Sequence, residues 1–150
     1  MKSPRAARLA AEKGYTNVYL YQEGLLGWGK AGYDFETKEA LPRMRVNLIK
    51  PDDLERSLES DPTIFIVDIR DDDLYETLRF SYRNTVHIPM AYLEDRLDEI
   101  PRDRKVVVAC HTGKQSVTAG PYLHSRGYDV IGCVDGGIMA WEKAGKPVLK

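Results

Sequence analysis

One short segment combines the residue types that could make a reactive thiol. Cys110 directly follows the apolar run of residues 106–109 and opens the segment Cys110-His111-Thr112-Gly113-Lys114-Gln115-Ser116. A buried strand that ends in a cysteine and leads through a loop into a helix directs backbone N–H groups and the positive end of the helix dipole at the sulfur. Such surroundings lower a thiol pKa from its ordinary value of ~8.5, whereas a core cysteine is inert. We therefore predict that Cys110 is a nucleophile and not a structural core residue.

The other side chains of this segment each allow two interpretations. Lys114 either adds positive charge near an anionic substrate or is a solvated surface residue, and His111 either tunes the thiol or is a bystander. Thr112 and Ser116 can donate hydrogen bonds to sulfur, although Ser116 is also a typical helix N-cap. Gly113 gives the loop conformational freedom. The sequence leaves these alternatives open.

Three further residues could contribute to a site. Asp68 and Arg70 lie at the end of another apolar run. They form a structural ion pair or contact the substrate, and we favour the ion pair. The second cysteine, Cys133, lies within a predicted strand, and we favour a buried apolar role over that of a resolving thiol. Because the two cysteines and three histidines lack metal-ligand spacing, we expect no metal site and no cofactor.

The elements that position these residues alternate along the chain from about residue 45. Apolar β-rich runs predict strands at residues 45–49, 63–68, 85–88, 105–109 and 130–134. Helical patterns follow at residues 51–59, 71–79, 92–100, 116–126 and 138–144. This order predicts an α/β domain around a mostly parallel sheet. Ligands of such sheets bind at the carboxyl ends of strands, where Cys110 lies.

Composition and charge exclude several classes of partner. The 150 residues are 43% hydrophobic and 30% charged, as in an ordinary globular protein. The 22 basic and 23 acidic residues are interspersed, which argues against nucleic acid or a membrane surface as a partner. Two cysteines make no disulfide framework, and no apolar stretch suggests a signal peptide or a membrane span. We expect a reducing, cytoplasmic setting.

The first 33 residues resemble the end of the chain at a constant offset of 113 positions. Gly14-Tyr15 falls on Gly127-Tyr128, and Trp28 falls on Trp141, without a gap. This internal repeat predicts a tandem protein. Residues 1–35 would be the C-terminal remnant of a first copy, residues 36–44 a linker, and residues 45–150 a complete domain.

The predicted remnant raises a question of packing. At the same offset Met1 corresponds to Lys114, so the nucleophile position of the first copy falls four positions before Met1. The remnant is expected to form an amphipathic helix, a strand at residues 18–21 and a second helix that carries Trp28. With no parent sheet, its apolar faces must pack on the complete domain or on another chain. A homodimer through residues 1–35 is therefore a hypothesis.

Residues 45–150 resemble the rhodanese-like sulfurtransferase family. The resemblance rests on the loop of residues 110–116 together with Asp68-Ile69-Arg70, His87-Ile88-Pro89-Met90, Gly127-Tyr128 and Asp135-Gly136-Gly137-Ile138-Met139-Ala140-Trp141. It implies a three-layer domain with a central, mostly parallel five-stranded sheet and helices on both faces. Two departures bear on substrate choice: residues 80–85 lack the Gly-His-Ile of many relatives, and Gln115 stands where many single-domain members have Arg.

The resemblance implies a sulfurtransferase in which Cys110 carries a persulfide. The donor would be a small molecule such as thiosulfate or a persulfide, and the acceptor a thiol, a cyanide-like nucleophile or a protein. An alternative is a non-enzymatic sulfur carrier or regulatory binding module. A cysteine phosphatase or arsenate reductase fits less well, because that chemistry needs Arg six positions after the cysteine. Here that position is Ser116.

Overall fold

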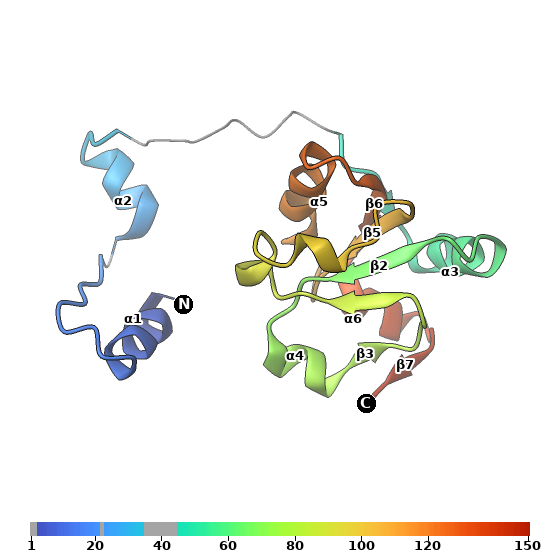
Figure 1. Cartoon of the computed structure of the whole chain (residues 1–150), viewed down its shortest axis with the longest axis horizontal. Coiled ribbons are helices and arrows are strands. Elements are labelled where there is room, and N and C mark those ends of the chain that lie inside the picture. Colours follow the sequence, from blue (N-terminus) through green and yellow to red (C-terminus); the bar gives the residue numbers. More distant parts are fainter. Residues whose placement is uncertain (1–2, 22, 35–44) are drawn as a thin grey trace. The chain divides into compact units, whose positions relative to one another are not determined.

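The computed structural model describes residues 3–21, 23–34 and 45–150 (Figure 1). The chain divides into two units, residues 1–40 and residues 41–150. The first contains the helices α1 (Ser3–Glu12) and α2 (Gly24–Lys30). The predicted linker, residues 36–44, lies outside the described residues. No described helix has the length and apolar character needed to cross a bilayer.

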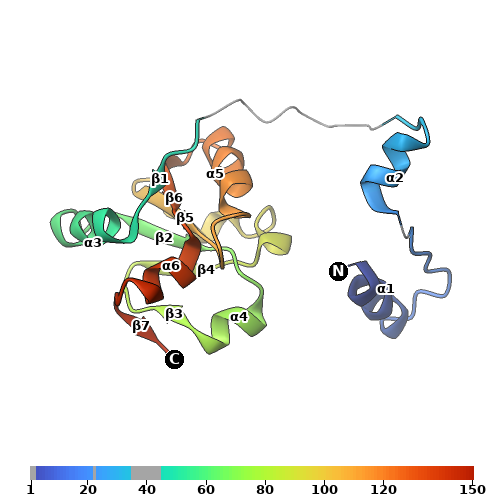
Figure 2. The same ribbon diagram turned by 180° about the vertical axis from the view of Figure 1, so that it is seen from behind.

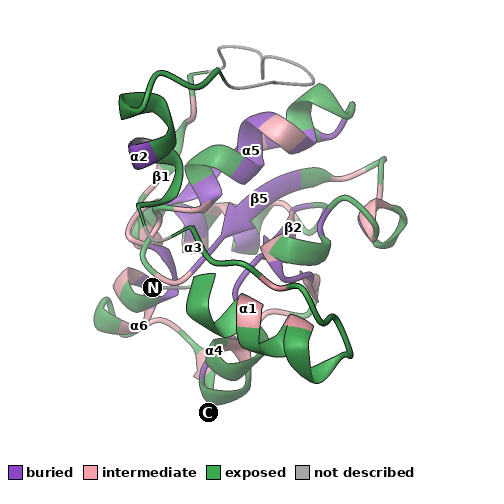
Figure 3. Ribbon diagram, turned by 90° about the vertical axis from the view of Figure 1, so that its left-hand side faces the viewer, coloured by how far each residue is buried: buried purple, intermediate pink, exposed green. Residues whose placement is uncertain are grey.

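The second unit is built around a parallel sheet of five strands in the order β1-β6-β5-β2-β4. These strands are β1 (Leu48–Ile49), β2 (Phe65–Asp68), β4 (Thr85–His87), β5 (Lys105–Ala109) and β6 (Asp129–Val134). The central strand β5 is an unbroken apolar run after Lys105, as expected for a parallel strand covered on both faces (Figure 3). The predicted α/β fold with a five-stranded parallel sheet is confirmed.

Helices cover both faces of the sheet (Figure 1, Figure 2). On one face, α5 (Ser116–Ser125) packs on Val106, Val108 and Cys110 in a single buried cluster. On the other, α3 (Pro51–Ser60) and α6 (Gly137–Lys143) pack on the side chains that alternate with these, Val107 and Ala109. The alternation of a strand's side chains therefore places Cys110 on the α5 side of the sheet.

One predicted helix is wrong. Residues 92–100 form two 3₁₀ turns, η1 (Met90–Tyr92) and η2 (Leu97–Glu99), instead of one α-helix. The apolar residues that suggested a helix do reach the core: Leu93 and Ile100 are both buried. Only these two side chains between Pro89 and Pro101 have to reach the core, and two short turns with i→i+3 hydrogen bonds are enough to direct them there.

The remaining differences concern short or unpaired strands. The strand predicted at residues 45–49 is limited to Leu48–Ile49. An antiparallel pair, β3 (Arg79–Phe80) with β7 (Val148–Leu149), was not predicted, and α4 (Asp72–Thr77) precedes it. The strand predicted at residues 18–21 is also wrong: within the described part of the first unit, no strand is formed. A strand exists only where a neighbouring strand accepts its hydrogen bonds, and residues 3–21 and 23–34 offer none.

Candidate active site

Cys110 lies one residue beyond the carboxyl end of β5, and only 1% of it is exposed. Two main-chain hydrogen bonds hold the start of its loop against the first turn of α6. The N–H of Ile138 donates to the Cys110 carbonyl at 3.0 Å, and that of Met139 donates to the His111 carbonyl at 3.2 Å. The nucleophile predicted from the sequence is therefore fixed by two elements, the strand before it and the helix after β6.

Glycines allow this close contact between the two segments. A Cβ atom at Gly137, where φ is +63°, would lie 2.3 Å from the Cys110 carbonyl oxygen. A Cβ atom at Gly113, where φ is +84°, would lie 3.0 Å from the Gly136 nitrogen. Only glycine combines this backbone conformation with the absence of a side chain. The loop thus has one tightly defined path past α6.

Ser116 is the polar side chain next to the thiol. The Cys110 Sγ–Ser116 Oγ distance is 3.6 Å, and the Ser116 hydroxyl donates to the Gly113 carbonyl at 2.9 Å. Ser116 is fully buried and is the first residue of α5, whereas Gln115 occupies the N-cap position. The structure therefore places the hydroxyl beside sulfur and not in an N-cap hydrogen bond.

The loop also offers main-chain donors that the fold leaves unused. Among the described residues, no backbone N–H group of residues 111–115 donates a hydrogen bond to another protein group. Thr112 and Lys114 are exposed, and Lys114 forms no ion pair with any described residue. His111 has a buried Nδ1 without a hydrogen-bond partner. This set of donors and one cation suits an anionic sulfur species.

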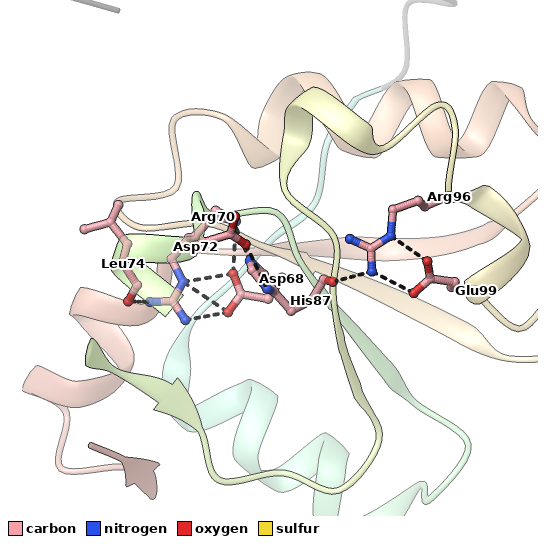
Figure 4. A network of polar contacts seen from close by, with 7 residues as sticks. All are labelled: Asp68, Arg70, Asp72, Leu74, His87, Arg96 and Glu99. Carbon is pink, nitrogen blue, oxygen red and sulfur yellow. Dashed lines mark hydrogen bonds and ion pairs between the residues drawn. The ribbon is translucent and has the colours of Figure 1, made fainter. Parts of the chain in front are cut away.

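Asp68 and Arg70 form a buried ion pair at the neighbouring strand end (Figure 4). Arg70 Nη2 lies 2.6 Å from Asp68 Oδ2, and Nε lies 2.9 Å from Oδ1. A third donor, Nη1, reaches the Leu74 carbonyl at 2.9 Å. Asp68 stands opposite Ala109 in the sheet register, so the pair is adjacent to the Cys110 strand end. Its geometry is that of a fixed structural pair, since both groups are already engaged.

Contacts of His87, which the sequence did not predict, lie next to this ion pair. His87 Nε2 lies 2.7 Å from the Arg70 carbonyl, so that this nitrogen is the donor. Arg96 donates to the His87 carbonyl (Figure 4). The His87 ring also stacks on Tyr75, with centroids 3.8 Å apart. The sequence pointed to His87 only through the family resemblance, and nothing local indicated its contact with the β2 end.

Cys133 lies beneath the same loop. It is fully buried on the face that carries Cys110, and its thiol donates to the Ser116 carbonyl at 3.2 Å. Burial raises the pKa of the Cys133 thiol to about 12. Such a thiol stays protonated at neutral pH, which suits a buried apolar role and not a resolving one. Among the described residues, no group of His, Cys, Asp and Glu side chains could hold a metal ion.

The family model of the rhodanese-like domain matches residues 50–144. The chain belongs to the rhodanese-like domain family. Curated relatives agree: a sulfurtransferase of Allochromatium vinosum is 34% identical over 104 residues, which are 69% of this chain and 95% of that protein. The putative sulfurtransferase YtwF of Bacillus subtilis is 29% identical over 69% of this chain and 98% of its own length. These relatives place the chain in a sulfurtransferase family.

Solved rhodanese structures share the fold. A rhodanese-related protein from Thermoplasma volcanium superposes with a TM-score of 0.61 and 26% identity, over 69% of this chain and 97% of that chain. A rhodanese-like domain protein from Staphylococcus aureus superposes with a TM-score of 0.58 and 28% identity, over 64% and 91% of the two chains. The rhodanese-like unit of this chain is thus comparable in extent to free-standing rhodanese domains.

Proposed function

We propose that this protein is a sulfurtransferase that carries sulfane sulfur as a persulfide on Cys110. One observation carries the proposal: a thiol stands at the carboxyl end of β5, at the start of a loop whose backbone N–H groups the fold leaves unused. The relatives named sulfurtransferase, among them a thiosulfate sulfurtransferase GlpE of Vibrio cholerae that is 30% identical over 83 residues, support it.

In the loading step the Cys110 thiolate attacks the outer sulfur of thiosulfate. A Cys110–S bond to that sulfur forms, the S–S bond of thiosulfate breaks, and sulfite leaves with its electron pair. Charge is conserved, because the thiolate becomes a persulfide anion and the dianion becomes sulfite. The free N–H groups of residues 111–115 would stabilise the anionic sulfur. Because Cys110 is 1% exposed, the exposed part of the loop must admit the donor.

The Ser116 hydroxyl can hydrogen-bond to the Cys110 sulfur in either protonation state of the sulfur. While Cys110 is a thiol, its S–H can donate to Ser116 Oγ, whose own proton goes to the Gly113 carbonyl. When sulfur is anionic, the same hydroxyl can turn its proton toward it instead. In the second step an acceptor such as cyanide attacks the outer persulfide sulfur, leaves as thiocyanate and restores the Cys110 thiolate.

A sulfur carrier that hands the persulfide to a protein partner is the second candidate. It is favoured by a relative named putative sulfur carrier protein YrkF of Bacillus subtilis, which is 24% identical over 106 residues. Phosphoryl transfer is not favoured, because the loop contains no arginine and the buried Arg70 is engaged by Asp68 and Leu74. Both sulfur candidates require the same persulfide on Cys110.

Intact mass spectrometry tests the proposal directly. After incubation with thiosulfate, the chain is expected to gain the mass of one sulfur atom and to lose it again when cyanide is added. Cys110→Ser should abolish the gain. Cys133→Ser is the matched control and should retain it, because the Cys133 thiol stays protonated.

The outcomes separate the candidates. Loading with release to cyanide as thiocyanate supports the enzyme, whereas loading that only a protein acceptor removes supports the carrier. A chain that never gains sulfur, or that gains it on Cys133 while Cys110→Ser still loads, would refute both.

A further inference from the structure

A small apolar groove lies between α5 and the segment that follows Pro89. One wall comes from η1 and the residues just after it, and the other comes from α5. Its volume is about 220 Å³, and the side chains that line it are mostly apolar: Met90, Leu93, Glu94, Thr118, Ala119 and Tyr122. Sites for drug-sized ligands have volumes of about 300–1,000 Å³. This groove therefore fits a smaller organic molecule.

The α5 wall of the groove is continuous with the thiol site. Ala119 follows Ser116 by three residues on α5, so the two side chains are neighbours on the helix, with Cβ atoms roughly 5–6 Å apart. The Ser116 hydroxyl in turn lies 3.6 Å from the Cys110 sulfur. Ala119 and Cys110 also belong to one buried cluster. The groove thus begins about one helical turn from the thiol.

The opposite wall is joined to the end of the Cys110 strand. The N–H of Met90 donates to the Ile69 carbonyl at 3.1 Å, and the N–H of Ile69 donates to the Ala109 carbonyl at 2.9 Å. Leu93 is buried in the cluster that contains Cys110. The elements that hold Cys110 therefore also hold both walls, and the groove is formed before a ligand arrives.

The groove differs in its chemistry from the loop beside it. The loop offers unused N–H groups and the exposed Lys114, which suit an anion. Of the residues that line the groove, only Glu94 is charged, and its carboxylate lies 3.7 Å from the Arg126 guanidinium, which balances the charge. Thiosulfate and cyanide are small anions that gain nothing from such a surface. A carbon chain is stabilised there, because its burial removes apolar surface from water.

Tyr122 adds an unused polar group to the groove. Its hydroxyl is buried and has no hydrogen-bond partner among the described residues. The Arg126 guanidinium lies over its ring, 5.1 Å from the ring centroid. Most buried hydroxyl groups in proteins have a partner. A ligand whose carbon chain ends in a hydroxyl or carbonyl group can supply one.

We propose that this groove binds the carbon chain of a small organic thiol that accepts sulfur from Cys110. The inference rests on the proposed function, because it needs the Cys110 persulfide. The acceptor thiolate attacks the outer sulfur of the protonated persulfide, and a bond forms between these two sulfurs. The bond from the outer sulfur to Cys110 breaks, and its electron pair stays on Cys110. The products are an organic persulfide and the Cys110 thiolate, so the step needs no oxidant or reductant.

Two thiols that differ only in chain length test the proposal. The protein is loaded with thiosulfate, freed of excess donor, and treated with 2-mercaptoethanol or 6-mercaptohexan-1-ol. Intact mass spectrometry follows the loss of the added sulfur. The longer thiol should have a second-order rate constant higher by about tenfold or more, because part of its chain is buried in the groove. Hexan-1-ol, which has no thiol, should slow the longer thiol and not the shorter one.

Two substitutions on α5 form a matched pair. Thr118 is exposed and lines the groove, so Thr118→Phe should fill it and make the two rate constants nearly equal. His124 is also exposed on α5 but does not line the groove. His124→Phe adds the same ring there and should keep the wild-type ratio of rate constants.

The outcomes separate this inference from the proposed function. A protein that thiosulfate never loads refutes the proposed function, and this inference with it. A loaded protein that both thiols unload at similar rates, or that only a protein acceptor unloads, overturns the groove alone. So does a preference for the longer thiol that persists in Thr118→Phe. Competition by hexan-1-ol needs no variant, and its absence would overturn the inference even if Thr118→Phe failed to fold.

Discussion

Residues 3–34 and 116–147 make a natural comparison within one molecule. Both form two helices of matching bounds with left-handed glycines at matching places. In the second region the segment between the helices is a central strand, and the apolar residues around it are buried. In the first region the corresponding segment forms no strand within the described residues, and Leu25 is exposed.

The difference separates local from long-range causes of structure. Helix ends and glycine turns persist in both regions because their hydrogen bonds close over a few residues. The strand is lost in one region because its hydrogen-bond partners come from elsewhere in the sequence. Substitutions at matched positions should therefore have large effects in the second region and small ones in the first.

The largest contrast is expected at the paired glycines that open α2 and α6. Gly137→Ala places a Cβ atom 2.3 Å from the Cys110 carbonyl oxygen in a left-handed backbone. We expect a loss of roughly 3 kcal/mol or more in free energy of unfolding, together with loss of sulfur loading. Gly24→Ala meets no atom within 4 Å but shares the left-handed backbone at a φ of +58°, so we expect only the local backbone strain of about 1–2 kcal/mol and unchanged sulfur loading.

Urea unfolding and intact mass spectrometry of the two variants check this contrast. A Gly137→Ala protein that keeps wild-type stability would show that the contact between the loop and α6 is not a constraint. A Gly24→Ala protein as damaged as Gly137→Ala would show that the first unit is packed as tightly as the second.

The next contrast is a pair of apolar residues one position further along. Ile138 is fully buried and Leu25 is 76% exposed. Ile138→Ala should lower the free energy of unfolding by about 2–5 kcal/mol, because it leaves a cavity. Leu25→Ala should change it by no more than about 0.5 kcal/mol. Equal losses in denaturant titrations of the two variants would contradict the comparison.

The same distinction explains how far the sequence predicts the fold. Residues 105–109 read as a strand and form β5 with those bounds, since a β-branched apolar run has one main interpretation. Residues 92–100 read as a helix but form two 3₁₀ turns. Their apolar spacing is compatible with both. The pairing of β3 with β7 could not be predicted, because each strand has only two residues and lies far from its partner in sequence.

The features of the candidate site also divide into those set by local sequence and those set by contacts between distant segments. The sequence indicates Cys110, its glycine-containing loop and the Asp68–Arg70 pair, all of which rest on local order along the chain. It does not indicate the stacking of His87 on Tyr75, which depends on how two segments meet in space. Nor does it indicate that the Cys133 thiol donates to the Ser116 carbonyl, since that contact needs α5 to pack on β6.

The smallest expected contrast is in the pH dependence of stability at the matched positions Cys133 and Leu20. Burial raises the pKa of the Cys133 thiol to about 12 from a value of 9.0. Between these values the unfolded chain has lost this proton and the folded chain keeps it, so stability falls as pH rises. The limiting slope is about 1.4 kcal/mol per pH unit.

Urea unfolding of the wild type and of Cys133→Ala is measured from pH 9 to 10.5, and the slope of the unfolding free energy against pH is compared between the two proteins. The difference between the two slopes is the contribution of the Cys133 thiol, because the titration of tyrosine and lysine is the same in both and cancels. Cys133→Ala should have the shallower slope. Leu20→Cys places a thiol at the matched position, where Leu20 is 42% exposed, and should keep the wild-type slope because its pKa is the same in both states. A steeper slope for Leu20→Cys would mean that residues 16–21 are covered in the isolated chain, and the contrast between the two regions would fail.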